Sequence, residues 1–233
     1  MGGGHQWQQP TFTGQYAAER AQRKTITLPD GSQLAMDADT QAQVTLYRDR
    51  REVRLVEGQI LFAVTADSSK PFHVLAGAAR VSVVGTRFSV RYRSEGMDAG
   101  LVKVAVEQGH VRVAGLPAAG NESAAVDLVA GQGLSVAANG AVGAVTAVAP
   151  SGIALWRKGL VRFENTPLAD ALRELERYGP TGLVIRNPAV AALPIGGSYP
   201  VDHPGEFARM VTQILPVKLV AGAGGTTEIA SAP

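Results

Sequence analysis

The residues that could do chemistry are few and lie far apart in the sequence. None of the four histidines is spaced from another histidine, or from a cysteine, as zinc ligands are. They stand at His5, His73, His110 and His203. The chain has no cysteine, which excludes thiolate catalysis and disulfides. We therefore expect ordinary surface or partly buried histidines, with no metal and no cofactor.

Carboxylates, serines and glycine-rich stretches also lack a catalytic pattern. Glu57 and Glu107 each stand close to a turn glycine. Two such carboxylates could do acid/base chemistry, but a shared turn requirement explains them better. No GxSxG nucleophile motif is present, and Gly222 to Gly225 lacks the Lys and Ser/Thr that complete a phosphate-binding loop. The sequence therefore predicts that the protein is not an enzyme.

Basic residues alternate with aromatic residues in one stretch, as they do in binders of single-stranded nucleic acid. Arg87, Arg91 and Arg93 flank Phe88 and Tyr92. On a strand, this pattern predicts a solvated face over a buried face. The net charge of the whole chain is only +2, which is too small for the electrostatic footprint of a nucleic-acid binder. We expect no nucleic-acid partner.

The region from residue 23 to residue 138 reads as a series of short β-strands with no amphipathic helix. Its turn glycines are nearly periodic, with separations of 27, 27, 24 and 24 residues. They are Gly31, Gly58, Gly85, Gly109 and Gly133. This repetition favours an all-β domain with a solenoid-like or rolled repeat architecture. A β-sandwich would show similar turns and is the alternative.

The tail begins with a strand–helix–strand pattern. Gly159 to Glu164 alternates polar and apolar residues as a strand does. We expect Thr166 to cap the helix that follows, with Pro167 in its first position. The apolar face of that helix is formed by Leu168, Ala171, Leu172 and Leu175, and Leu183 to Ile185 forms the next strand.

The same pattern then repeats. Ile195 to Tyr199 is the expected strand, and a helix with Phe207, Met210, Val211 and Ile214 on one face follows. Val217 to Val220 is the last strand of the unit, and Thr226 to Ile229 is expected to add an edge strand. Together these elements predict a small α+β domain of two βαβ units.

Four segments result from these patterns. Residues 1–22 are a flexible leader, 23–138 the all-β domain, 139–155 a linker rich in Ala, Gly and Val, and 156–233 the βαβ-βαβ domain. The sequence has no apolar run of 18 or more residues that could span a membrane. It also begins without the basic and apolar regions of a signal peptide.

Blocks of the β region resemble the FecR domain. In order along the chain they are LPDGS (28–32), VRLVEGQILFAV (53–64), PFHV (71–74), VVGTRFSV (83–90) and VAVEQGHVRV (104–113). The tail resembles the short secretin/TonB N-terminal (STN) domain, in the version that closes the periplasmic half of FecR-type regulators. The residues that carry this second resemblance are Trp156, Gly159, Phe163, Asn165, Pro167, Leu168, Leu172 and Tyr178.

The resemblance implies the receiving module of a transmembrane anti-sigma regulator. In that family, the N-terminal signalling domain of an outer-membrane TonB-dependent siderophore receptor passes its occupancy to the regulator in the periplasm. An extracytoplasmic-function sigma factor in the cytoplasm is then released to transcribe iron-uptake genes, and periplasmic or intramembrane proteases are further partners. The resemblance implies a periplasmic location, with an inner-membrane helix and a cytoplasmic segment upstream of this chain.

We expect the tail to bind the receptor domain through an exposed strand, because strand addition needs no catalytic site. The candidate contact residues lie on the first strand of each βαβ unit and are Leu160, Arg162, Glu164, Ile195, Ser198 and Tyr199. The alternative is an extracytoplasmic module that binds glycan or peptidoglycan, although aromatic residues make up only 6% of the chain. A hydrolase on a β scaffold ranks last.

Overall fold

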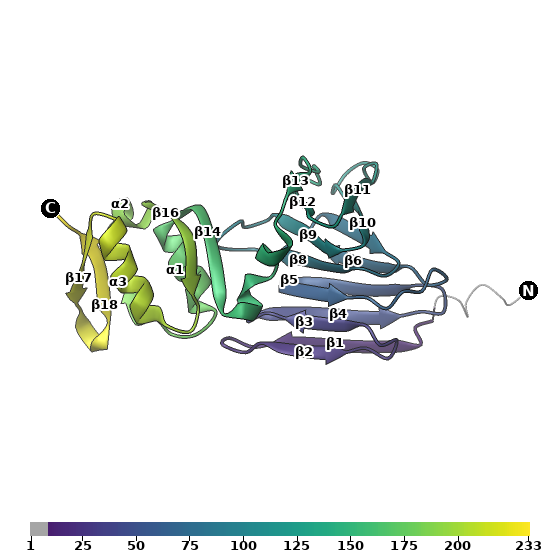
Figure 1. Cartoon of the computed structure of the whole chain (residues 1–233), viewed down its shortest axis with the longest axis horizontal. Helices are drawn as coiled ribbons and strands as arrows, with labels where there is room; N and C mark the ends of the chain where they lie inside the picture. Colours follow the sequence, from purple (N-terminus) through teal and green to yellow (C-terminus); the bar gives the residue numbers. More distant parts are fainter. Residues whose placement is uncertain (1–8) are drawn as a thin grey trace, which may run out of the picture. The chain divides into compact units, whose positions relative to one another are not determined.

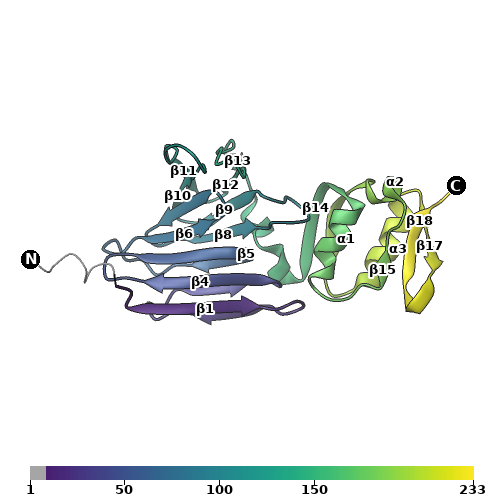
Figure 2. The same ribbon diagram turned by 180° about the vertical axis from the view of Figure 1, so that it is seen from behind.

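The computed structural model describes residues 9–233 and divides the chain into two compact units, Met1–Ala154 and Leu155–Pro233. Figures 1 and 2 show the strands of the first unit in purple to teal and the mixed second unit in green to yellow. The chain is mostly β. No helix among the described residues is long and apolar enough to cross a membrane.

The first unit contains thirteen strands that are linked in one hydrogen-bonded network. Between residues 23 and 138 it has no helix, as predicted. The strands are β1 (Phe12–Ala18), β2 (Lys24–Thr27), β3 (Gln33–Met36), β4 (Thr40–Leu46), β5 (Arg51–Ala63), β6 (Phe72–Ala76), β7 (Ala79–Val83), β8 (Arg87–Tyr92), β9 (Val102–Gln108), β10 (His110–Gly115), β11 (Val126–Val129), β12 (Gln132–Val136) and β13 (Thr146–Ala147).

Strand β5 belongs to two layers at once. Its first half pairs with β4 and β6, and its second half pairs with β3 and β8. The first layer therefore runs β1-β4-β5-β6-β7-β10-β11, and the second runs β2-β3-β5-β8-β9-β12-β13. The predicted rolled domain is confirmed as a curled open sheet whose two layers share their longest strand.

Glycines stand where the chain passes from one layer to the other. Gly58 lies inside β5 with φ of 116°, and a Cβ there would come within 2.2 Å of the Thr40 hydroxyl oxygen. Gly109 separates β9 from β10, which belong to different layers. The periodic glycines at these positions are thus corners between layers. The prediction was wrong for Gly133, which lies inside β12, because Gly131 with φ of 82° makes that corner.

Aromatic rings join the two layers across the core. Phe62 and Phe88 of the second layer stack with ring centroids 5.0 Å apart, and Phe62 meets Phe72 of the first layer edge-on at 6.1 Å. All three side chains are fully buried. Because aromatic pairs add about 0.5–1.5 kcal/mol beyond the burial of their area, this cluster fixes how the layers face each other.

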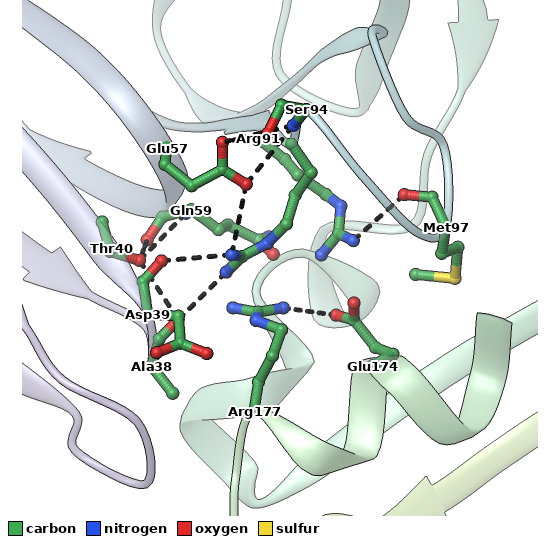
Figure 3. A network of polar contacts seen from close by, with 11 residues as sticks. Ala38, Asp39, Thr40, Glu57, Gln59, Arg91, Ser94, Met97, Glu174 and Arg177 are labelled. Atoms are coloured by element: carbon green, nitrogen blue, oxygen red, sulfur yellow. Dashed lines mark hydrogen bonds and ion pairs between the residues drawn. The ribbon is translucent and has the colours of Figure 1, made fainter.

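The prediction of a solvated arginine face on β8 was wrong. Arg91 and Arg93 are buried, with exposed fractions of only 7% and 6%. Arg93 donates to the carbonyl oxygens of Ala38 and Asp39 at 3.0 and 3.1 Å, and Arg91 donates to the Met97 carbonyl oxygen (Figure 3). These guanidinium groups satisfy loop carbonyls that burial would otherwise leave without water.

Part of the predicted leader, residues 1–22, is a strand of the first unit. Residues 1–8 lie outside the described residues. Phe12–Ala18 forms β1, which pairs with β4 along its whole length, so the prediction was wrong there. The strand was missed because polar residues separate Phe12 from Tyr16, the two side chains that pack against the core.

The second unit follows the predicted order of strands and helices, with one short helix, α2, that was not predicted. Its elements are β14 (Leu160–Pro167), α1 (Leu168–Glu176), β15 (Leu183–Val184), α2 (Pro188–Ala191), β16 (Pro194–Pro200), α3 (Pro204–Ile214), β17 (Val217–Ala221) and β18 (Thr227–Ser231). Strands β14 and β16 form an antiparallel pair, and β15-β18-β17 form a second sheet. The expected edge strand β18 is therefore central, because β15 pairs with it in parallel.

One local prediction in the second unit was wrong. Thr166 does not cap α1, because its hydroxyl bonds to the backbone of Glu164 and β14 continues to Pro167. On α3, Phe207 is fully buried, whereas Ile214 is 56% exposed. The helix turns only part of its apolar surface inward and leaves an apolar strip in solvent.

A buried arginine ties the start of β5 to three loops. Arg51 is 2% exposed and donates to the backbone carbonyls of Thr65, Lys70 and Val84 at 2.8 to 3.1 Å. It also pairs with the Asp30 carboxylate at 2.8 Å. Burial tends to raise the pKa of Asp30, but hydrogen bonds from Arg51 and Ser32 outweigh it, and the pKa lies below its usual 3.8.

Replacement of Gly58 by alanine is expected to destabilise the first unit by about 2 kcal/mol or more, since the backbone angle and the Thr40 contact both oppose a Cβ. Gly152→Ala is the matched control, because nothing lies within 4 Å of a Cβ at that position. Urea unfolding followed by far-UV circular dichroism measures both. Equal midpoints for the two variants would contradict the corner role of Gly58.

The lowered pKa of Asp30 predicts a loss of stability in acid. A carboxyl group whose pKa is lower in the folded state stabilises the fold above its unfolded pKa, here near 3.8, and loses this contribution as the pH falls through the folded value. Asp30→Asn should therefore have a flatter stability profile than the parent between about pH 5 and pH 2. If the stability of both proteins changed with pH in the same way, the Asp30–Arg51 pair would not contribute to the loss of stability in acid.

Candidate partner-binding surface

The structure places the histidines in separate, structural settings. His73 lies on β6, and its Nδ1 is 2.8 Å from the Ser82 hydroxyl on β7. Burial, followed by the charge of Arg80, lowers the pKa of His73. His110 lies 3.3 Å from Asp127, and His203 immediately precedes α3. His5 lies outside the described residues, and within residues 9–233 no group of three or more His, Asp or Glu could hold a metal ion.

The two carboxylates near the corner glycines have different structural roles. Glu57 accepts hydrogen bonds from the backbone N–H and hydroxyl of Ser94 (Figure 3), and it lies 3.6 Å from Arg93. Glu107 pairs with Arg87 at 3.1 Å. Each carboxylate is held by its own arginine, and each secures a corner.

The strands chosen from the sequence as a contact surface do lie side by side. In the β14–β16 pair, Arg162 stands opposite Ser198, and Leu160 stands opposite Pro200. The Arg162 and Glu164 side chains are 62% and 77% exposed and form an ion pair at 3.1 Å. This outer face is therefore accessible and polar.

Two of the predicted contact residues point into the core instead. Ile195 and Tyr199 are each 3% exposed. The Tyr199 ring packs between Phe163 at 5.6 Å and Phe207 at 5.4 Å, and its hydroxyl donates to the Gly196 carbonyl at 2.8 Å. Burial also raises the pKa of Tyr199. The prediction was wrong for these two side chains, because alternation along β16 turns them away from Ser198.

The backbone of this strand pair is a poor template for a further strand. Strand β16 has proline at both ends, Pro194 and Pro200, and proline offers no N–H to a ladder. In β14 the register shifts between Phe163 and Thr166, where Asn165 has φ of 47°. Prolines and bulges of this kind are common devices that protect sheet edges from pairing.

A second surface of the unit is more apolar. Strand β17 is an edge strand, and its Leu219 and Val220 are each 39% exposed. On α3, which packs against β17, Met210 is 37% exposed and Ile214 is 56% exposed. We call the surface formed by strand β17, with Met210 and Ile214 of α3, the β17 edge. Sequence reasoning missed it because Met210 and Ile214 fit a buried helix stripe, and only the sheet order identifies β17 as an edge.

A cavity of about 190 Å³ lies between the end of α1 and the start of α3. Its lining includes Leu175, Tyr178 and Asp202. Sites for small molecules are typically about 300–1,000 Å³. The cavity is therefore too small for a ligand such as a siderophore, and a protein surface remains the better candidate site.

Tyr199 offers a test of the corrected assignment. Tyr199→Ala should lower the stability of the second unit by about 3–5 kcal/mol, the usual cost of deleting a buried aromatic side chain. Ser198→Ala, on the exposed face of the same strand, should change it by less than about 0.5 kcal/mol. Thermal unfolding of the full chain compares the two. If Tyr199→Ala is as stable as the parent, the tyrosine is not part of the core and the original prediction of a surface contact holds.

Comparison with known proteins gives matches at two levels. Residues 14–112 match the family model for the FecR protein. Two crystal structures of a "putative anti-sigma factor" from Parabacteroides distasonis ATCC 8503, at 2.50 and 1.65 Å resolution, share the fold of nearly the whole chain. Both have a TM-score of 0.78 and 22% sequence identity, and the matches cover 95% and 94% of this chain and 100% of theirs.

No curated protein matches the sequence. The predicted FecR resemblance is confirmed for residues 14–112, which include the corners at Gly58 and Gly109. The STN resemblance of the second unit stays a prediction. The family match therefore holds for residues 14–112, and the two solved structures share the fold of nearly the whole chain.

Proposed function

We propose that this chain is the periplasmic, signal-receiving module of a FecR-type transmembrane regulator. The main support for the proposal is the FecR match over residues 14–112. In addition, 95% of the chain shares the fold of a protein described as a putative anti-sigma factor. The partner on the receiving side is the N-terminal signalling domain of an outer-membrane TonB-dependent siderophore receptor. The second unit, which we propose to be an STN-like domain, supplies the contact.

The output side lies outside this chain. An upstream inner-membrane helix would connect the module to a cytoplasmic segment that controls an extracytoplasmic-function sigma factor. The first unit would serve as a rigid spacer, since its corners are fixed by Arg51 and Arg93. Exposure of the chain to periplasmic or intramembrane proteases would then relay the iron-uptake signal.

A role in glycan binding is less well supported. Carbohydrate sites commonly stack sugar rings on exposed aromatic side chains, which are large and rigid contact surfaces. In the first unit, Phe62, Phe72 and Phe88 are instead fully buried, and its other described aromatic side chains are only partly exposed. Binding to cell-wall material in a sedimentation assay would favour this alternative.

Calorimetric titration tests the proposed partner. The full chain should bind the signalling domain of one TonB-dependent receptor from the same genome saturably, and it should not bind the signalling domains of the paralogous receptors. Selective binding of this kind would identify the receptor and its pathway. If the chain binds none of these domains, the proposed function is wrong and the FecR fold serves another partner.

A further inference from the structure

We infer that the β17 edge receives one extended strand of the partner protein, apolar on the side that faces α3 and acidic on the other side. The inference rests on the proposed function and deepens it by naming the surface and the chemistry of the segment that binds there. It replaces the exposed face of β14 and β16 as the expected site of contact.

The apolar layer of the three-stranded sheet is incomplete at β17. Ile229 of the central strand β18 is fully buried, and Leu219 stands directly opposite it on the same side of the sheet. Val217, on that side too, is 5% exposed, whereas Leu219 is 39% exposed. The side chains of one more strand beside β17 would cover Leu219, in the same way that the side chains of β17 cover Ile229.

Helix α3 packs against β17 and carries an exposed apolar strip beside its buried one. Its buried residues Phe207 and Val211 face the existing strands. Met210 and Ile214 lie one turn apart on the neighbouring strip, and both are exposed. An added strand would place alternate side chains under this strip, so that every second residue of the partner segment must be apolar.

Two cations flank the apolar surface. Arg209 precedes Met210 on α3, and Lys218 precedes Leu219 on the opposite side of β17. Both are exposed, and among the residues that the structure describes neither takes part in an ion pair. Carboxylates on the outer side of the partner strand would be complementary to Lys218, which lies on that side of β17. This is the charge pattern that the partner segment must carry.

The backbone of β17 is suited to pairing. Val217–Ala221 contains neither proline nor glycine and pairs with β18 without a register shift. The β14–β16 pair, in contrast, has the terminal prolines and the bulge described above. Burial of apolar surface also favours β17 as the binding site, whereas an exposed ion pair such as Arg162–Glu164 contributes little to binding.

The test uses the full chain and the receptor signalling domain that binds it in the calorimetric series. Leu219→Glu should weaken that binding by roughly tenfold or more, because it places a carboxylate in the apolar seam. Lys218→Glu, on the solvent side, should weaken it by a smaller factor that shrinks as salt is added. Arg162→Glu, on the β14 surface, is the matched control and should bind like the parent.

Amide hydrogen exchange gives a second measurement that does not depend on variants. Binding of the same receptor domain should slow exchange in residues 217–221 and leave β14 unchanged. Protection at β14 instead, or unaltered binding by both β17 variants, would overturn the inference while the proposed function stands. If the parent chain binds no receptor domain, both the inference and the proposed function are wrong.

A second copy of this chain is the competing occupant of the edge. Sedimentation velocity of the parent and of Leu219→Glu separates the two cases. A parent dimer that Leu219→Glu converts to a monomer, with receptor binding unchanged, would overturn the inference. A monomeric parent whose receptor binding is weakened by the same substitution supports it.

Discussion

The bend of β5 at Gly58 is the constraint on which the first unit depends. One strand supplies the centre of both layers, so the angle between the layers is set by a single backbone position that no other residue type fits. Around it, Arg51 holds the start of the strand, and Glu57 with Arg93 holds the corner. The phenylalanine cluster can form only when this bend has brought Phe72 over Phe62.

The regular elements could be predicted from the sequence, because their patterns are local. Alternation identified β14, and helical spacing identified α1. Periodic glycines indicated repeated strand units. Their spacing could not reveal that Gly58 and Gly109 stand between layers whereas Gly31 makes a turn between two strands of one layer, since a turn and a corner have the same sequence requirement and only the pairing partners distinguish them. The same limit applies to β18, whose central place depends on distant β15.

Predicting the site was harder because exposure is a property of the assembled unit. Alternation correctly put Arg162 and Glu164 on the outer face of β14. On β16 alternation also puts Ile195 and Tyr199 on one face and Ser198 on the other, and the predicted contact set was wrong because it combined the two faces. Met210 and Ile214 have the spacing of a helix face, yet both are exposed in the folded unit. The candidate surface therefore moves from a polar face to an apolar edge.

Strand β1 shows how the first unit would begin to open. It is bonded on one side only, to β4, and its inward residues Phe12 and Tyr16 are only partly buried. Detaching it breaks the pairing with β4 and leaves the pairs between the other strands in place, so we expect the free energy of this local opening to lie below that of global unfolding. Tension applied at the N-terminal end would meet this strand first. Strand β1 would then detach and extend while β5 and the strands paired with it stay folded. Under force, β1 is thus the part of the first unit that we expect to unfold first.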